Sequence, residues 1–475
     1  MKNGATEGTQ LKHKRNVVRK KGLNKIDTFV LAFGAMIGWG WVVLSGEWIL
    51  RAGTLGAAIA FVFGGIMVLF VSQLYAELTT AIPGEGGAFL FSERAFNIRV
   101  AFVCVWMLLL SYIAVIAFEA VALPTVVSYL FPQYVRGYLY TVAGFDVYAT
   151  WLILGILASL FLMFINILGI KTATFMQTVL TVVVLLVGAM FFTGAFINGD
   201  LGNAQPLFAD GLSGIIGVMV MTPFMYVGFD VIPQTASEMN IPKKKIGQIL
   251  ILAVAIAVLW YVLIIAGVGV TMNHGQMQHS SIITADAMAN AYGGSRIASN
   301  VLIIGGIAGI LSCWNAFYIG GSRVLCSLAA KGLLPAILAK KHPKYGTPYV
   351  GVLLIGGLTT CAPFLGRNML VWLSNSGGFG TVITYFIISL SFLVLRKKEP
   401  TLDRPYKVRY PYLIGFGALL CCLCLIVLYT PGMPSSLRWP YEWGIIIAWA
   451  IVGAVLYGFA AQKRNRAKRR VSFEQ

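Results

Sequence analysis

The chain has 475 residues, of which 58% are hydrophobic and only 11% are charged. Soluble domains carry about 25% charged residues, so this composition excludes a soluble multidomain enzyme, and it also excludes a disordered or fibrous chain. Together with a mean hydropathy of +0.80, it predicts an all-α protein that crosses a membrane many times. A membrane β-barrel is excluded because the apolar runs are long and continuous, without alternation.

Twelve apolar runs are long enough to cross a bilayer as helices, which takes about 20 residues. They lie near 27–50, 54–79, 100–130, 148–169, 172–198, 211–235, 246–272, 296–328, 347–365, 369–395, 411–430 and 441–462.

The basic residues predict the orientation of these spans. The net charge is +19, and 31 of the 36 lysines and arginines fall in the two tails and in alternate loops. Basic residues in short loops stay on the cytoplasmic side, so both ends of the chain are expected in the cytoplasm. The five on the other side are Arg51, Arg136, Arg296, Arg367 and Arg438.

Two spans contain residues that interrupt a helix. The first carries Gly34, Gly38 and Gly40 near its middle, and each glycine in a helix interior costs about 1 kcal/mol relative to alanine. The sixth carries Pro223 and Pro233, and proline removes a helical hydrogen bond and clashes with the preceding turn. Unpaired backbone at membrane depth is tolerated only against protein or beside a water-filled cavity.

The first and sixth spans would correspond in an inverted repeat of five plus five spans. Paired discontinuous helices at matching positions indicate the central site of a transporter, although glycines in a single span would more simply indicate close helix packing. We therefore expect repeats at 27–198 and 211–395, two further spans within 396–462, and basic cytoplasmic tails at 1–26 and 463–475.

Several motifs resemble those of the amino acid–polyamine–organocation superfamily, whose members share the leucine-transporter fold. The first span is similar to the superfamily's unwound G-x-x-x-G-x-G stretch, and four further similarities follow in the expected order. They are Pro83–Phe89, Tyr226–Asp230 with Glu238 and Asn240–Pro242, Ser322–Leu325 with Gly332–Pro335 and Tyr345–Pro348, and Arg404–Lys407. Five such motifs in order are far more specific than any one alone.

This resemblance implies a secondary transporter of amino acids or related organic amines that works by alternating access. Substrate would lie between the unwound parts of spans one and six, where free amides can hold a carboxylate, with spans three, eight and ten completing the pocket. The residues expected to bind substrate are Gly34, Met36, Gly38, Trp39, Gly40, Tyr112, Phe224, Tyr226 and Gly228.

Among the aromatic residues of this set, Trp39 and Phe224 stand at positions with a characteristic residue in the superfamily. Trp39 stands where the superfamily usually has serine or threonine. Its indole either lines the pocket, where it would narrow the space or face an organic cation, or turns towards a neighbouring helix. Phe224 occupies the position of the superfamily's aromatic gate.

Two acidic residues lie within spans, where an ionised carboxylate costs about 3 kcal/mol. Glu119 shares a helix face with Tyr112 and Val115. It would either pair with a substrate ammonium group or carry a proton, or else bond to another helix. Asp230 matches the superfamily's acidic residue in span six and is expected to serve a gating or structural hydrogen-bond network.

The sequence does not single out one coupling ion. Proton-driven relatives carry a lysine in span five, but Val184 stands at the matching position. Sodium-coupled relatives use two hydroxyls in span eight, where Ser312 matches one and Leu311 replaces the other. Sodium near Ser312, a different proton site and uncoupled exchange all remain alternatives.

No cofactor, metal centre or enzyme activity is expected, because the spans contain no histidine cluster and no nucleophile with a base. The basic tails are explained by anionic lipid headgroups, so no nucleic acid partner is expected, and the oligomeric state is not indicated. The predicted location is the plasma membrane. A nutrient sensor on the same fold would carry the same signals, whereas a channel fits a single chain with an inverted repeat poorly.

Overall fold

The structure is a computed structural model that describes residues 22–433 and 435–473, with side chains as far as Arg464. Its first half contains α1 (Lys25–Met36), α2 (Gly40–Val43), α3 (Ser45–Ala52), α4 (Thr54–Ala81), α5 (Gly87–Ala95), α6 (Ile98–Leu130), α7 (Ala149–Ile167), α8 (Ile170–Asn198) and α9 (Gly211–Met219). Its second half contains α10 (Thr222–Tyr226), α11 (Val231–Thr235), α12 (Lys243–Thr271), α13 (His274–Gln278), α14 (Ile283–Ala291), α15 (Arg296–Ala330), α16 (Tyr349–Thr360), α17 (Met369–Lys398), α18 (Pro411–Leu428) and α19 (Tyr441–Phe473).

Most of these helices are membrane-spanning candidates. Among the described residues, ten helices are long and apolar enough to cross a bilayer, with the run from Gly211 to Glu238 taken as one. The two other apolar runs of the sequence form α1 to α3, which are short helices in series, and α16 with the 3₁₀ turn η5 (Ala362–Leu365). The protein is therefore a multi-pass membrane protein.

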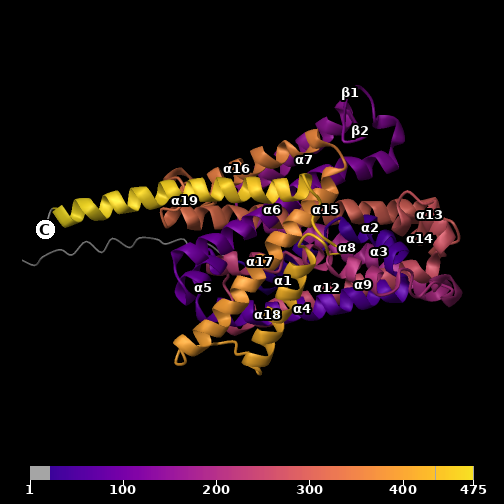
Figure 1. Cartoon of the computed structure of the whole chain (residues 1–475). Helices are drawn as coiled ribbons and strands as arrows, with labels where there is room; N and C mark the ends of the chain where they lie inside the picture. The colour runs from indigo at the N-terminus through magenta and orange to yellow at the C-terminus, as the bar shows by residue number, and fades with distance from the viewer. Residues whose placement is uncertain (1–21, 434, 474–475) are drawn as a thin grey trace, which may run out of the picture.

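The long helices run roughly along a common axis, and several of the shorter elements lie at its two ends (Figure 1). The strands β1 (Tyr138–Val142) and β2 (Phe145–Tyr148), together with α13 and α14, lie at one end, which we call the hairpin end. Helix α5 and the end of α19 lie at the other, which we call the C-terminal end.

The β-hairpin is a difference from the all-α prediction. Strands β1 and β2 pair antiparallel through a two-residue turn in which Ala143 has φ of 49° and Gly144 has φ of 80°. Positive φ at both positions is the arrangement that matches the twist of a hairpin. The side chain of Asn368 donates a hydrogen bond of 2.5 Å to the carbonyl oxygen of Ala143, so the hairpin is joined to the loop before α17.

The bundle is held together by helices that are distant in sequence. Helix α6 packs along α15 and α17, and α4 packs along α12. Helix α19 is peripheral, with only 17% of its most apolar stretch buried. The central helices therefore enclose the two segments that the sequence marks as interrupted.

Candidate substrate site

The first interruption lies between α1 and α2. Helix α1 ends at Met36, whose C-cap Ile37 has φ of −108° and ψ of 76°, and α2 begins at Gly40. Only three residues leave the helix, so the unwound stretch is shorter than the glycine pattern suggests. Gly34 stays in α1 and Gly40 belongs to α2.

The second interruption lies between α10 and α11, over residues 227–230. Gly228 has φ of +133°, a conformation that residues with a β-carbon rarely adopt. Its N–H donates a hydrogen bond of 2.9 Å to Oδ1 of Asp230. A β-carbon at Gly228 would lie 2.7 Å from both the β-carbon and the carbonyl carbon of Ala35, so the second break packs directly against the end of α1.

Tyr261 of α12 connects the two breaks. Its hydroxyl lies 2.9 Å from the carbonyl oxygen of Met36 and 3.2 Å from that of Met225. Both carbonyls belong to helix ends, where the last carbonyl groups have no partner within the helix. A single buried hydroxyl on α12 thus lies within hydrogen-bonding distance of main-chain carbonyls from both interrupted spans, and its one hydrogen can be shared between them.

A small cavity of about 20 Å³ lies between the two breaks. A water molecule needs roughly 10–15 Å³ measured in this way, so the cavity holds about one water and is closed to a larger ligand. It is lined by Ala35, Met36, Gly38, Gly40, Val115, Phe118, Glu119, Phe224, Met225, Val227, Tyr261, Cys313 and Phe317. The lining is mostly apolar, with one carboxylate.

That carboxylate, on Glu119 of α6, is only 2% exposed. Its Oε1 lies 3.4 Å from the main-chain nitrogen of Trp39 and accepts a long hydrogen bond from it. Its Oε2 has no hydrogen-bond partner among the described residues. An acidic side chain in the cavity therefore faces an amide that the first break leaves free.

Four of the nine residues predicted to bind substrate line this cavity, together with the predicted coupling residue Glu119. The four are Met36, Gly38, Gly40 and Phe224. The other five, and the remaining gating or coupling candidates Asp230 and Ser312, lie outside the lining.

Some of these outlying residues pack elsewhere in the core. The Tyr226 hydroxyl donates a 3.0 Å hydrogen bond to the carbonyl oxygen of Phe61, so this side chain faces α4. The Tyr112 ring packs edge-on against Phe317 at 4.9 Å between centroids.

Ser312 and Gly34 belong to a buried polar chain between α1, α8 and α15. The Ser312 hydroxyl donates to the carbonyl oxygen of Gly34 at 3.1 Å and accepts from Nε2 of Gln177 at 2.8 Å. Asn315 continues the chain by donating to Oε1 of Gln177 at 2.8 Å. Ser312, Gln177 and Asn315 are thus bonded to one another. Among the described residues, no three histidine, cysteine, aspartate or glutamate side chains gather where they could hold a metal ion.

The Trp39 side chain turns towards a neighbouring helix, which was the second alternative for this residue. A β-carbon at Gly306 of α15 would lie 2.6 Å from Cζ3 of the Trp39 indole, so the ring packs on that glycine. Trp39 also lines two larger hollows at the hairpin end, of about 690 and 260 Å³. Trp39 therefore connects the first break with both hollows.

The sequence patterns did not single out several of the lining residues. Tyr261, Cys313 and Phe118 lie in uniformly apolar spans, where packing explains an aromatic or small residue equally well. The Cys313 thiol lies 3.2 Å from the carbonyl oxygen of Ala35, a contact that sequence spacing does not indicate. Only their places in the folded bundle bring them to the cavity.

Two interrupted membrane helices in mutual contact, around a buried cavity, define the class of membrane transporters with discontinuous helices. The profile of the family described as amino acid permease matches residues 23–457. The chain belongs to this amino acid permease family, and it is a membrane transporter.

Individual relatives cover nearly the whole chain. The branched-chain amino acid permease BcaP of Bacillus subtilis is 27% identical, over 94% of each chain. The methylthioribose transporter of the same organism is 25% identical, over 93% of this chain and 94% of the relative. The lysine-specific permease LysP of Escherichia coli is 24% identical, over 88% of each. Relatives of similar identity thus carry names with different substrates.

Proposed function

We propose that this protein is a secondary transporter that moves an amino acid, or a related amine, across the plasma membrane by alternating access. The observation that carries the proposal is the contact between the two breaks: Gly228 packs on Ala35, and Tyr261 bonds to main-chain carbonyls of both spans. Free main-chain groups around a buried cavity suit a ligand with an ammonium and a carboxylate group.

The pattern of helix contacts supports twelve spans with a five-plus-five repeat. If α1 to α3 form span one and α9 to α11 span six, the remaining helices of each repeat correspond in order. The contact of α6 with α17 then matches that of α15 with α8, and the contact of α6 with α7 matches that of α15 with α16. Helices α4 and α12, the second span of each repeat, pack on one another. Helices α18 and α19 follow as two additional spans.

In this proposal the small cavity is the collapsed substrate site. Its lining favours a substrate with an apolar side chain, because Val115, Phe118 and Phe317 surround the space beside Phe224. Met36, Gly38 and Gly40 contribute the edge of the first break, and Glu119 pairs with the substrate ammonium group or carries a proton. Asp230 and Ser312 stabilise the broken helices from outside the lining. The transport assay described below distinguishes a proton from sodium as the coupling ion.

The proposed orientation puts both termini in the cytoplasm, so that the hairpin end faces outwards. At the opposite end, a bridge between Leu23 and Met239 joins the segment before α1 to the segment after α11. The ion pair of Arg323 with Glu238 joins this second segment to α15. The two hollows that Trp39 lines, of about 690 and 260 Å³, lie at the hairpin end, which supports an outward-facing state.

The proposal is tested by reconstitution into proteoliposomes. Vesicles loaded with unlabelled leucine should accumulate radiolabelled leucine by counterflow, in a saturable manner, with a panel of other amino acids and amines as competitors. The assay is repeated with imposed proton and sodium gradients to identify the coupling ion. A Glu119→Gln variant should lose at least tenfold in uptake. Absence of counterflow for every member of the panel would favour a nutrient sensor, and non-saturable flux would favour a channel.

A further inference from the structure

Two hollows open at the hairpin end, and four of the five arginines at that end line them. The larger, of about 690 Å³, is lined by Arg296 and Arg367, and the smaller, of about 260 Å³, by Arg51 and Arg438. Trp39 and Val43 line both. We call the larger hollow the upper vestibule, and it reaches the first break at Trp39, which belongs to both.

The upper vestibule carries two guanidinium groups with no carboxylate in its lining, and the Glu47 carboxylate in the smaller hollow acts on Arg367 from a distance. Arg296 and Arg367 form no ion pair with any of the described carboxylates, since the six pairs found there involve other basic residues. No carboxylate lines this hollow. Asp286, which approaches from α14, has Oδ1 bonded to the Tyr129 hydroxyl at 3.1 Å and Oδ2 to the Ser280 hydroxyl at 2.5 Å.

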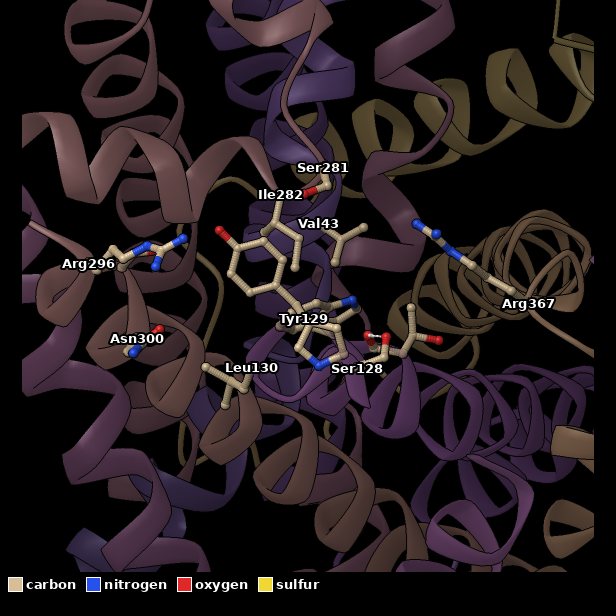
Figure 2. A pocket seen from close by; sticks show the side chains of 13 residues that line it. Val43, Ser128, Tyr129, Leu130, Ser281, Ile282, Arg296, Asn300 and Arg367 are labelled. Carbon is tan, nitrogen blue, oxygen red and sulfur yellow. Dashed lines mark hydrogen bonds between the residues drawn. The ribbon is translucent and has the colours of Figure 1, made fainter. Parts of the chain in front are cut away.

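The arrangement of the two arginines suits a ligand between them. Figure 2 shows Arg296 and Arg367 on opposite sides of the hollow, with Tyr129 and Ser128 between them. Ser299 and Asn300 add further polar groups to the lining. The volume lies in the range of pockets that hold small organic ligands, whereas the cavity at the break, of about 20 Å³, does not.

Guanidinium groups bind carboxylates through two parallel hydrogen bonds, and they remain charged at any physiological pH. Two guanidinium groups in a hollow without a carboxylate also repel cations and raise the local concentration of anions. We propose that the upper vestibule is a first binding site for the carboxylate of the substrate, formed by Arg296 and Arg367 above Trp39. The substrate class is then a zwitterionic or anionic amino acid, and net-cationic amino acids and polyamines are disfavoured.

This proposal rests on the proposed transport of amino acids, and it adds a site that the broken helices do not contain. It is first tested without transport, by labelling the purified full chain with phenylglyoxal and quantifying each modified arginine by mass spectrometry. L-leucine should protect Arg296 and Arg367 at least threefold, while L-leucinamide, which lacks the carboxylate, should not. Arg136 is exposed at the same end, lines neither hollow, and serves as the internal control.

A second measurement uses proteoliposomes. Arg296→Gln and Arg367→Gln should each raise KM for leucine three- to tenfold with little change in kcat, and should weaken the preference for leucine over lysine. Arg136→Gln removes the same charge and should change neither.

The outcomes separate the two proposals. Equal protection of all three arginines, or of none, overturns the carboxylate site. An unchanged KM in a variant that combines Arg296→Gln with Arg367→Gln overturns it too, provided that wild-type uptake is normal. Wild-type protein that transports no amino acid or amine overturns the proposed function instead, whatever the labelling result.

Discussion

Oε1 of Glu119 lies directly over Gly38, so that a β-carbon at position 38 would come within 2.1 Å of this oxygen. Glu119 is fixed on the long helix α6, and Cys313 is the next neighbour of Gly38, at 3.0 Å from the same β-carbon position. Gly40 meets only the flexible thioether of Met225. Gly38 in the first break and Gly40 at the start of α2 therefore differ in how well they tolerate a side chain.

We expect Gly38→Ala to reduce uptake more than tenfold, because the methyl group displaces the Glu119 carboxylate from the Trp39 amide. Gly40→Ala should retain at least a third of wild-type uptake, since the Met225 side chain can move. Gly357→Ala is the control, because Gly357 lies in α16 and has no atom within 4 Å of the added carbon. Equal activity of the Gly38 and Gly40 variants would contradict this account.

The Tyr261 hydroxyl predicts a second phenotype. Tyr261→Phe leaves the carbonyl groups of Met36 and Met225 without this donor, and an unsatisfied buried polar group costs about 1–3 kcal/mol. We expect lower thermal stability in detergent together with reduced uptake. Tyr292→Phe removes one hydroxyl bond to a carbonyl, that of Met190 at 2.8 Å, away from both breaks, and it should leave uptake unchanged. Comparable losses of uptake in both variants would argue against a special role for Tyr261.

A buried ion cluster at the C-terminal end gives a third prediction. Glu77 of α4 is 1% exposed and lies 2.5 Å from Arg396 and 3.0 Å from Arg404. Glu77→Gln removes the carboxylate that pairs with both arginines, and breaking a buried pair in this way costs about 3–5 kcal/mol. Thermal unfolding monitored by loss of monodisperse protein is the measurement.

The exposed pair of Lys331 with Glu93, at 2.7 Å, provides the comparison for this cluster. Glu93→Gln should cost less than about 1 kcal/mol, because surface ion pairs contribute little. If the Glu77 and Glu93 variants unfold at the same temperature, the cluster does not stabilise the loop that carries Arg404.

Two tryptophans attach the peripheral helix α19 to α6, and they give a fourth prediction. Trp106 Nε1 donates to the carbonyl oxygen of Trp449 at 2.9 Å, and Trp449 Nε1 donates to that of Trp106 at 2.8 Å. Their rings are stacked with centroids 4.4 Å apart. A double-mutant cycle with phenylalanine at both positions should give a coupling energy of about 1 kcal/mol. Trp439→Phe, at an exposed position, is the control. A coupling energy near zero would mean that the lipid alone holds α19 in place.

Much of the architecture could be predicted from the sequence because it depends on local signals. The length of the apolar runs indicates the helices, and the glycines of span one and the prolines of span six indicate the two interruptions. The hairpin was missed, although Tyr138 to Tyr148 contains two short β-prone runs around Ala143 and Gly144. These two runs are much shorter than the apolar runs of the spans, so the sequence alone did not identify them as strands.

The surroundings of the breaks could not be predicted in the same way. Tyr261 contacts both breaks only because α12 packs beside α1, and Trp39 lies on α15 only because Gly306 leaves room for the ring. These relationships depend on tertiary packing, which spacing within one helix does not encode. The predicted roles of Tyr112 and Tyr226 in substrate binding remain predictions, and their positions outside the cavity lining make them less direct candidates.

The bridge between Leu23 and Met239 provides a built-in reporter. The amide of Leu23 donates to the carbonyl oxygen of Glu238, and the amide of Asn240 donates to that of Leu23, both at 2.9 Å. In the proposed cycle, these two segments separate when substrate is released to the cytoplasm. Both amide protons then become exchangeable with solvent. Deuterium uptake at these two amides would therefore report how often the transporter faces inwards, without any label attached to it.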